Sequence, residues 1–249
     1  MIKIENVVLP SPSQWNAVIR GMRNPMNSWD RSDSYSTHIE NPETLNTADF
    51  QFFLGDNDLT LMKKLAKAGS VHAKFLRMIP VYADIIAPLY WWKEYDTYKV
   101  GAVANSCSTM HKVEAKIFTI NDFSYEHLMN DAVVDLSNTI NSLNYFRMVY
   151  LHGGELCDKL GNWTHFEPKS KEVWWQMIQL LPSSYNQRRT VSLNYEVLRN
   201  IYYYRKDHKL DEWRIFCEWI ETLPYAEGLI VRDEDTLQNA KTKAMVTED

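Results

Sequence analysis

Residues 182–205 read PSSYNQRRTVSLNYEVLRNIYYYR, and this segment carries the most specific pattern in the chain. It predicts a basic loop followed by a tyrosine-rich helix. On an ideal helix, Asn194 and Arg205 lie within about 20° of one another, three turns apart. The neighbouring Arg188 and Arg189 would suit a phosphate, because a guanidinium binds oxyanions bidentately. The pattern indicates a site for a planar ring and an anion. The alternative is that Asn194 caps the helix and the arginines are solvated surface charges.

The length and composition predict a globular chain. It has 249 residues, of which 45% are hydrophobic, enough for a sizeable core. We find no internal repeat or clear linker, so residues 1–231 are expected to form a single domain. Within it, residues 1–50 are expected to be an irregular extension, and 232–249 a disordered charged tail. No apolar run approaches the roughly 18 residues of a membrane span, and the N-terminus lacks a signal-peptide pattern, so we expect a cytoplasmic protein with no membrane partner.

Charge and cysteine content exclude several functions. The net charge of −5 gives no electrostatic basis for binding nucleic acid. The three cysteines, Cys107, Cys157 and Cys217, are far apart and in no zinc-ligand spacing, so neither disulfides nor a metal site are expected. Aromatic residues make up 13% of the chain, which suits planar ligands, although core packing is their commoner use.

Hydrophobic periodicity predicts a mixed α/β (α+β) fold. Asn57 is a candidate N-cap, and Gly153-Gly154 is expected to end a long helix. Between the predicted elements lie a small-residue stretch at 100–111 and a loop through Pro168. The pattern predicts helices near 13–22, 57–69, 88–99, 123–151, 172–181, 194–205 and 211–222, and a strand near 75–86 in which Pro80 needs an edge or a bulge.

The spacing after Leu181-Pro182 resembles that of a known family. Asn194 follows Pro182 by twelve residues, Asn200 comes six later and Arg205 five after that. A His-containing turn and an acidic-aromatic pair, Glu212-Trp213, come next. This is similar to the C-terminal signature of the flavin-dependent thymidylate synthases (ThyX), which runs Leu-Pro, a Tyr/Trp-rich stretch, Asn-x5-Asn-x4-Arg and a His-containing turn. The resemblance spans roughly residues 59–224.

The upstream half of the resemblance departs from the family pattern. The family has a strand, Ala-Pro, a helix and then Arg-His-Arg-x-x-Ser-x-Asn-Glu-x-Ser-x-Arg-Tyr. Here the corresponding window, 97–110, reads TYKVGAVANSCSTM. Only Lys99 keeps a positive charge, and Thr109 replaces the last Arg. A shift of one residue would instead align Asn105 with the motif Asn and Ser108 with its Ser. A second family arginine, four residues before the Pro, is Ile178 here.

The resemblance implies the ThyX fold, with a mixed central sheet, flanking long helices and a homotetrameric assembly. It implies methylation of dUMP to dTMP with FAD as cofactor, and NADPH and methylenetetrahydrofolate as co-substrates. Arg205 would be the catalytic residue, stabilising negative charge on the pyrimidine. Residues implied to contact FAD are His72, Thr97, Tyr98, Lys99, Asn105, Asn194, Glu196 and Asn200. Residues implied to contact the nucleotide are Glu94, Ser106, Cys107, Ser108, Thr109, Arg188, Arg189 and Arg205.

The altered motif leaves two alternatives open. One is flavin-dependent hydroxymethylation, or methylation, of another pyrimidine deoxynucleotide. The other is a nucleotide-binding homologue without catalysis. Without the family arginines at Thr109 and Ile178, a buried phosphate needs other charged partners, and Arg188 and Arg189 are the candidates. Nothing basic lies beside Cys107 in the sequence, so we expect a small, semi-buried residue there and no nucleophile.

Overall fold

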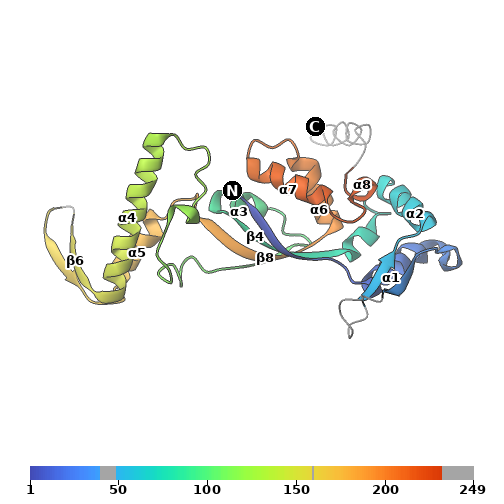
Figure 1. Cartoon of the computed structure of the whole chain (residues 1–249), viewed down its shortest axis with the longest axis horizontal. Coiled ribbons are helices and arrows are strands. Elements are labelled where there is room, and N and C mark those ends of the chain that lie inside the picture. The colour runs from blue at the N-terminus through green and yellow to red at the C-terminus, as the bar shows by residue number, and fades with distance from the viewer. Residues whose placement is uncertain (40–48, 159, 232–249) are drawn as a thin grey trace. The chain divides into compact units, whose positions relative to one another are not determined.

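A computed structural model describes residues 1–39, 49–158 and 160–231 as a mixed α/β chain (Figure 1). Short 3-10 turns lie at Asn24–Met26, Trp29–Arg31, Lys74–Met78 and Ile120–Asp122. The strands are β1 (Lys3–Val8), β2 (Tyr35–Ile39), β3 (Asp49–Phe53), β4 (Pro80–Pro88), β5 (Val103–Ser106), β6 (Gly154–Cys157), β7 (Trp163–Phe166) and β8 (Asn186–Asn194). The helices are α1 (Pro12–Arg23), α2 (Asp56–Lys67), α3 (Leu89–Tyr95), α4 (Asn130–His152), α5 (Lys171–Leu180), α6 (Tyr195–Arg205), α7 (Asp211–Glu221) and α8 (Ala226–Leu229).

Four strands form the main sheet in the order β1-β4-β8-β5, and β2–β3 and β6–β7 form separate antiparallel pairs. The inner strands alternate between a buried and an open face. In β8, Val191 and Leu193 are buried, whereas Arg188 and Thr190 are exposed. This is the period of two expected for a strand that covers a core on one side.

The contacts divide the chain into two compact units. Unit 1 comprises Met1–Lys3, Ile85–Thr97 and Asn105–Arg189. Unit 2 comprises Ile4–Asp84, Tyr98–Ala104 and, among the described residues, 190–231. The four strands of the main sheet contribute residues to both units. The expectation of one catalytic domain over residues 1–231 stays a prediction.

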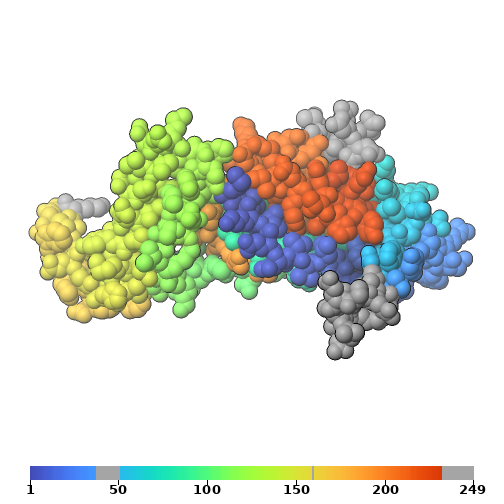
Figure 2. Space-filling view, in the orientation of Figure 1, coloured from blue at the N-terminus to red at the C-terminus, as the bar shows by residue number. Residues whose placement is uncertain are grey.

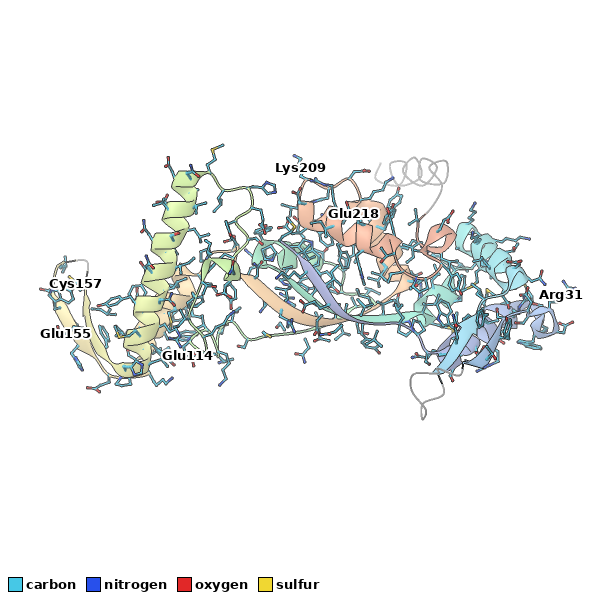
Figure 3. All side chains as sticks on the ribbon, viewed as in Figure 1. Arg31, Glu114, Glu155, Cys157, Lys209 and Glu218 are labelled. Atoms are coloured by element: carbon cyan, nitrogen blue, oxygen red, sulfur yellow. The ribbon has the colours of Figure 1, made fainter. Side chains whose placement is uncertain are left out.

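Unit 1 is built on the helix pair α4 and α5, which pack against each other (Figure 1). The β6–β7 hairpin, yellow in Figure 2, projects beyond α4, and Figure 3 labels Glu155 and Cys157 on it. Beside the hairpin lies a cavity of about 490 Å³ lined mainly by aromatic and aliphatic side chains. The core of the unit consists of Val113, Phe118, Phe123, Leu136, Ile140, Leu143 and Met177.

Unit 2 has an aromatic core centred on Trp15. Its ring stacks on Phe52 at 5.5 Å and meets the edges of Tyr195 at 6.4 Å and Tyr225 at 5.6 Å. These rings come from α1, β3, α6 and the turn before α8, so a single side chain joins four separate segments. Burial of large aromatic side chains is the main stabilising term for such a core.

Most predicted helices are confirmed. Those expected at 13–22, 57–69, 172–181 and 211–222 begin and end within two residues of the observed ends, and the helix after Pro88 begins at Leu89. Gly153, with φ of +79°, ends α4 as predicted. Asn57, however, is not an N-cap. Gly55 occupies that position, and the Asp33 carboxylate accepts hydrogen bonds from the backbone N–H groups of Asn57 and Asp58.

Other boundaries were predicted wrongly. The helix expected from Phe123 begins at Asn130, because Phe123 instead forms a β-bridge with Tyr185. The strand expected at 75–86 begins at Pro80, since the residues before it form a 3-10 turn. Proline has no N–H to donate and is tolerated as the first residue of a strand.

Three segments expected to be irregular contain strands. The basic loop is β8, the small-residue stretch contains β5, and the loop through Pro168 contains the β6–β7 hairpin. The N-terminal fifty residues also contain β1, α1 and β2. The disorder expected for residues 232–249 lies outside the described residues.

Candidate functional site

The predicted site residues fall on elements of both units. In unit 1 are Glu94 on α3, Thr97 after it, Asn105 and Ser106 on β5, Cys107, Ser108 and Thr109 after β5, and Arg188 and Arg189 on β8. In unit 2 are His72 after α2, Tyr98 and Lys99 after α3, Asn194 at the end of β8, and Glu196, Asn200 and Arg205 on α6.

Arg205 lies in a cluster of aromatic side chains in unit 2. Its Nε donates a hydrogen bond of 3.0 Å to the Tyr98 hydroxyl, and its guanidinium carbon lies 4.9 Å from the Trp213 ring centroid and 5.8 Å from that of Tyr98. His208 meets the edge of Trp213 at 6.4 Å. The rings hold the guanidinium by cation–π attraction and remove part of its hydration. Arg205 is therefore held by neighbouring side chains and is only partly exposed to solvent.

Asn194 caps α6, as the structural alternative proposed. Its side-chain oxygen accepts a hydrogen bond of 3.0 Å from the N–H of Val197, and its Nδ2 donates to the carbonyl of Gly101 at 3.3 Å. Gly101 has φ of +81°, and a Cβ there would lie 3.0 Å from Nδ2, so glycine suits this position. The cap ties α6 to the segment that holds Tyr98. Contact between Asn194 and FAD stays a prediction.

The other predicted FAD contacts of unit 2 are dispersed. Asn200 on α6, Lys99 and His72 are exposed. Glu196 is ion-paired with Arg77, which donates to both of its carboxylate oxygens. Residues 98–101 thus contact both ends of α6, through Gly101 to Asn194 and through Tyr98 to Arg205.

Arg189, in unit 1, is engaged by neighbouring side chains. Its Nη1 donates to Asp96 at 2.7 Å, its Nε donates to Gln187 at 2.9 Å, and its guanidinium carbon lies 4.2 Å from the Trp92 ring centroid. The side chain is only 14% exposed. These contacts indicate that Arg189 stabilises the packing of α3 against β8.

The segment around Cys107 forms hydrogen bonds with β8. The Cys107 N–H donates to the carbonyl of Arg188 at 2.9 Å, and Gln187 donates to the carbonyl of Cys107 at 2.7 Å. The thiol is exposed, so the expectation of a semi-buried residue was wrong, because Cys107 follows an edge strand. Asn105, Ser106 and Ser108 are also exposed, whereas Thr109 is half-buried.

Arg188 lies on the open face of β8, opposite Arg189. It lines a cavity of about 780 Å³ in unit 1 together with Lys3 and Lys116. Neither lysine could be found from the sequence, because neither belongs to a motif or carries a local signal. Only the folded chain brings them near Arg188.

The described residues contain neither a metal-binding cluster nor a membrane-spanning helix. Residues 1–39, 49–158 and 160–231 contain no cluster of histidine, cysteine or carboxylate groups suited to a metal ion. Within the same ranges, no helix has the length and apolar character to cross a bilayer.

Comparison with known proteins identifies the fold. No protein-family model and no curated protein matches the sequence. A flavin-dependent thymidylate synthase ThyX from Helicobacter pylori, complexed with FAD and dUMP, aligns with a TM-score of 0.57 at 13% identity over 92% of this chain and 97% of that one. A second Helicobacter pylori ThyX structure with FAD and dUMP gives 0.58 at 14% identity, over 95% and 99% of the two chains. This chain has the ThyX fold.

The ThyX fold extends beyond the segment in which the sequence resembles the family. The predicted resemblance covered residues 59–224, whereas the alignments cover 92% and 95% of the chain. A UMP/dUMP methylase, PolB from Streptomyces cacaoi, bound with 5-Br dUMP, aligns with a TM-score of 0.54 at 12% identity over 89% of both chains. The predicted fold class is confirmed.

Proposed function

We propose that this protein is a divergent flavin-dependent enzyme that methylates dUMP to dTMP. The observation that carries the proposal is the Arg205 guanidinium, held by the Tyr98 hydroxyl and the Trp213 ring in a chain with the ThyX fold. The two Helicobacter pylori ThyX structures with this fold contain FAD and dUMP. The co-substrates are NADPH and methylenetetrahydrofolate, and the protein acts as a cytoplasmic homotetramer.

Arg205 would act on the pyrimidine. Alkylation at C5 requires electron density on the ring, and this grows as negative charge develops along the N3–O4 edge. A guanidinium remains protonated throughout and presents two N–H groups in one plane, which match that edge. Because Trp213 and Tyr98 displace water from one side, the attraction between Arg205 and the developing charge is stronger than in bulk water.

FAD would supply the redox chemistry that reduces the transferred one-carbon group. In unit 2, Lys99 and Asn200 are exposed donors that would be available to such a group, and Tyr98 presents a ring beside Arg205. A cysteine nucleophile is not part of the proposal. Cys217 lies in the core, and burial raises the pKa of its thiol to about 12, so this cysteine stays protonated.

The proposal is tested with purified protein, dUMP, methylenetetrahydrofolate, FAD and NADPH, with the nucleotide product identified by mass. We expect Arg205→Gln to lower kcat about 100- to 1000-fold, the usual cost of removing a group that stabilises developing negative charge. Arg214→Gln is the matched control, because Arg214 pairs with Asp211 on the exposed side of α7. Flavin absorbance should be retained in both variants.

The possible outcomes separate the alternatives. A protein that binds no FAD would refute both flavin-dependent readings and leave a nucleotide-binding homologue. A flavin-loaded protein that leaves dUMP unchanged but converts another pyrimidine nucleotide would indicate altered specificity. The fold shared with a UMP/dUMP methylase makes UMP the first other substrate to test.

A further inference from the structure

Adjacent arginines on β8 point to different surroundings, because successive side chains of a strand alternate between its two faces. Arg189 lies on the covered face, with its donors directed to Asp96 and Gln187. Arg188 lies on the open face and lines the cavity of about 780 Å³. The sequence alone suggested that both guanidinium groups bind one phosphate. Their positions on opposite faces of β8 exclude this.

The cavity lies within unit 1 and is lined by residues that are distant in the sequence. Lys3 comes from β1, Lys116 from the segment after β5, and Asn186 and Arg188 from β8. Ile86 contributes an apolar wall from β4. A volume of this size accommodates a ligand as large as a nucleotide.

The cavity has an excess of positive side chains. Lys3, Lys116 and Arg188 face two carboxylates, those of Asp122 and Glu126. This local excess contrasts with the net charge of −5 of the whole chain. Clefts in which one sign of charge predominates concentrate ligands of the opposite sign.

The carboxylate of Asp122 is held by other groups of the protein. It is ion-paired with Lys116 and accepts a hydrogen bond of 2.8 Å from the N–H of Thr119. Burial acts to raise the pKa of Asp122, but the hydrogen bonds from Lys116 and Thr119 outweigh it and lower the pKa, so the carboxylate is ionised at neutral pH. Asp122 therefore positions the ammonium of Lys116 at the cavity.

We propose that this cavity binds the phosphate of a phosphate monoester, with Arg188 as the bidentate donor and Lys3 and Lys116 as flanking charges. A guanidinium fork and ammonium groups are the usual partners of phosphate oxygens, and the amide of Asn186 adds a neutral donor. The identity of the ester as a pyrimidine nucleotide rests on the proposed function. The phosphate site would then replace the charges that the ThyX resemblance places at Thr109 and Ile178.

Calorimetric titration of the flavin-loaded protein with three probes tests the proposal: dUMP, deoxyuridine and inorganic phosphate. Arg188→Gln should weaken dUMP binding about 10- to 100-fold, the cost of one charge-assisted bidentate contact. Deoxyuridine, which lacks the phosphate, should bind the unaltered protein and the Arg188→Gln variant equally. Stronger binding of dUMP than of inorganic phosphate identifies the nucleotide as the ligand, whereas equal binding identifies free phosphate.

Two further variants distinguish the effect of charges in the cavity lining from that of charges nearby. Lys3→Gln, at an exposed position of β1, should also weaken dUMP binding and guards against misfolding of the Arg188 variant. Lys112→Gln removes the same type of charge from the exposed segment near Lys116 but outside the cavity lining, and should leave binding unchanged.

The outcomes distinguish this site from the proposed function. If Arg188→Gln and Lys3→Gln bind dUMP as well as the unaltered protein, or if Lys112→Gln weakens dUMP binding equally, the phosphate site is refuted and dUMP recognition stands. If dUMP does not bind while inorganic phosphate binds in an Arg188-dependent way, the site stands and the proposed substrate is refuted. If neither dUMP nor inorganic phosphate binds, the site is refuted.

Discussion

Asp58 forms a buried ion pair with Arg23 in unit 2, and the pair provides a sharp test of how this unit is stabilised. The side chains are 0% and 4% exposed, and Arg23 Nε donates to Asp58 Oδ1 at 2.5 Å. The other oxygen, Oδ2, accepts hydrogen bonds from the Ser32 and Ser34 hydroxyls at 2.7 and 2.6 Å. The backbone N–H groups of Asp33 and Ser34 also donate to Oδ2, at 3.2 and 3.1 Å.

Substitution of Asp58 by Asn conserves the shape but leaves only one oxygen for five donors. If that oxygen takes the position of Oδ2, the new NH₂ group faces the Nε–H of Arg23, and two donors oppose one another. Among the described residues, Arg23 then keeps the carbonyl and the hydroxyl of Ser28, which accept at 3.1 and 3.3 Å, as neutral partners. Removing one member of a buried ion pair costs about 3–5 kcal/mol, so we expect a loss of that size in the free energy of unfolding.

Urea denaturation followed by tryptophan fluorescence measures this loss. Asp56→Asn is the control, since it removes the same charge from the exposed first turn of α2 and should cost less than about 1 kcal/mol. Combining Asp58→Asn with Arg23→Met should recover part of the stability, because the uncompensated charge is then absent. A loss no larger than that of Asp56→Asn would refute the reasoning.

The same pair makes a pH prediction. Burial acts to raise the pKa of Asp58, but hydrogen bonds from Ser34, Ser32 and Arg23 outweigh it, and the pKa lies below the ordinary value of 3.8. A carboxylate with a lowered pKa stabilises the fold above its unfolded pKa, and this contribution is lost as the pH falls from 3.8 toward the folded value. Asp58→Asn should lack this component of acid destabilisation.

Two further predictions concern the Arg205 cluster. Tyr98→Phe removes the hydroxyl that accepts from Arg205 at 3.0 Å but keeps the ring. A hydrogen bond to a charged group contributes about 1.5–3 kcal/mol, so kcat should fall about 10- to 100-fold with little change in the KM for dUMP; an unchanged kcat would contradict this role. Gly101→Ala should lower the free energy of unfolding by about 1–2 kcal/mol because φ is +81° and the new Cβ would lie 3.0 Å from Asn194 Nδ2. Urea denaturation checks the second prediction, and a stability unchanged from that of the parent would contradict it.

The helices could be predicted because their signals are local. The helix near 13–22 has the Ser11 cap, a proline in its first turn and apolar residues at helical spacing, all within one short segment. The strands β5 and β8 lack such signals. Residues 186–190 read NQRRT, which is typical of an exposed loop, and they are a strand because β4 and β5 pair with them on either side.

The same limit applies to the candidate sites. Arg205 could be found from its spacing after Pro182, since a motif is written in consecutive residues. Its contact with Tyr98, 107 residues away, depends on tertiary packing that the sequence does not state. Arg188 and Arg189 were treated as one charged pair because a loop imposes no alternation, whereas a strand sends them to opposite faces.

The departures from the family motif concern side chains more than the course of the backbone. Residues 98 to 101 lack the His and Arg of the motif, yet the structure fixes this segment at both ends, through Tyr98 to Arg205 and through Gly101 to Asn194. A segment tied to α6 in this way can keep its path while its other side chains change. This accounts for a shared fold at 12–14% identity, and it means that fold alone cannot specify the reaction. The identity of the product, and the dependence of its formation on Arg205, are therefore the measurements that decide between methylation of dUMP and altered specificity.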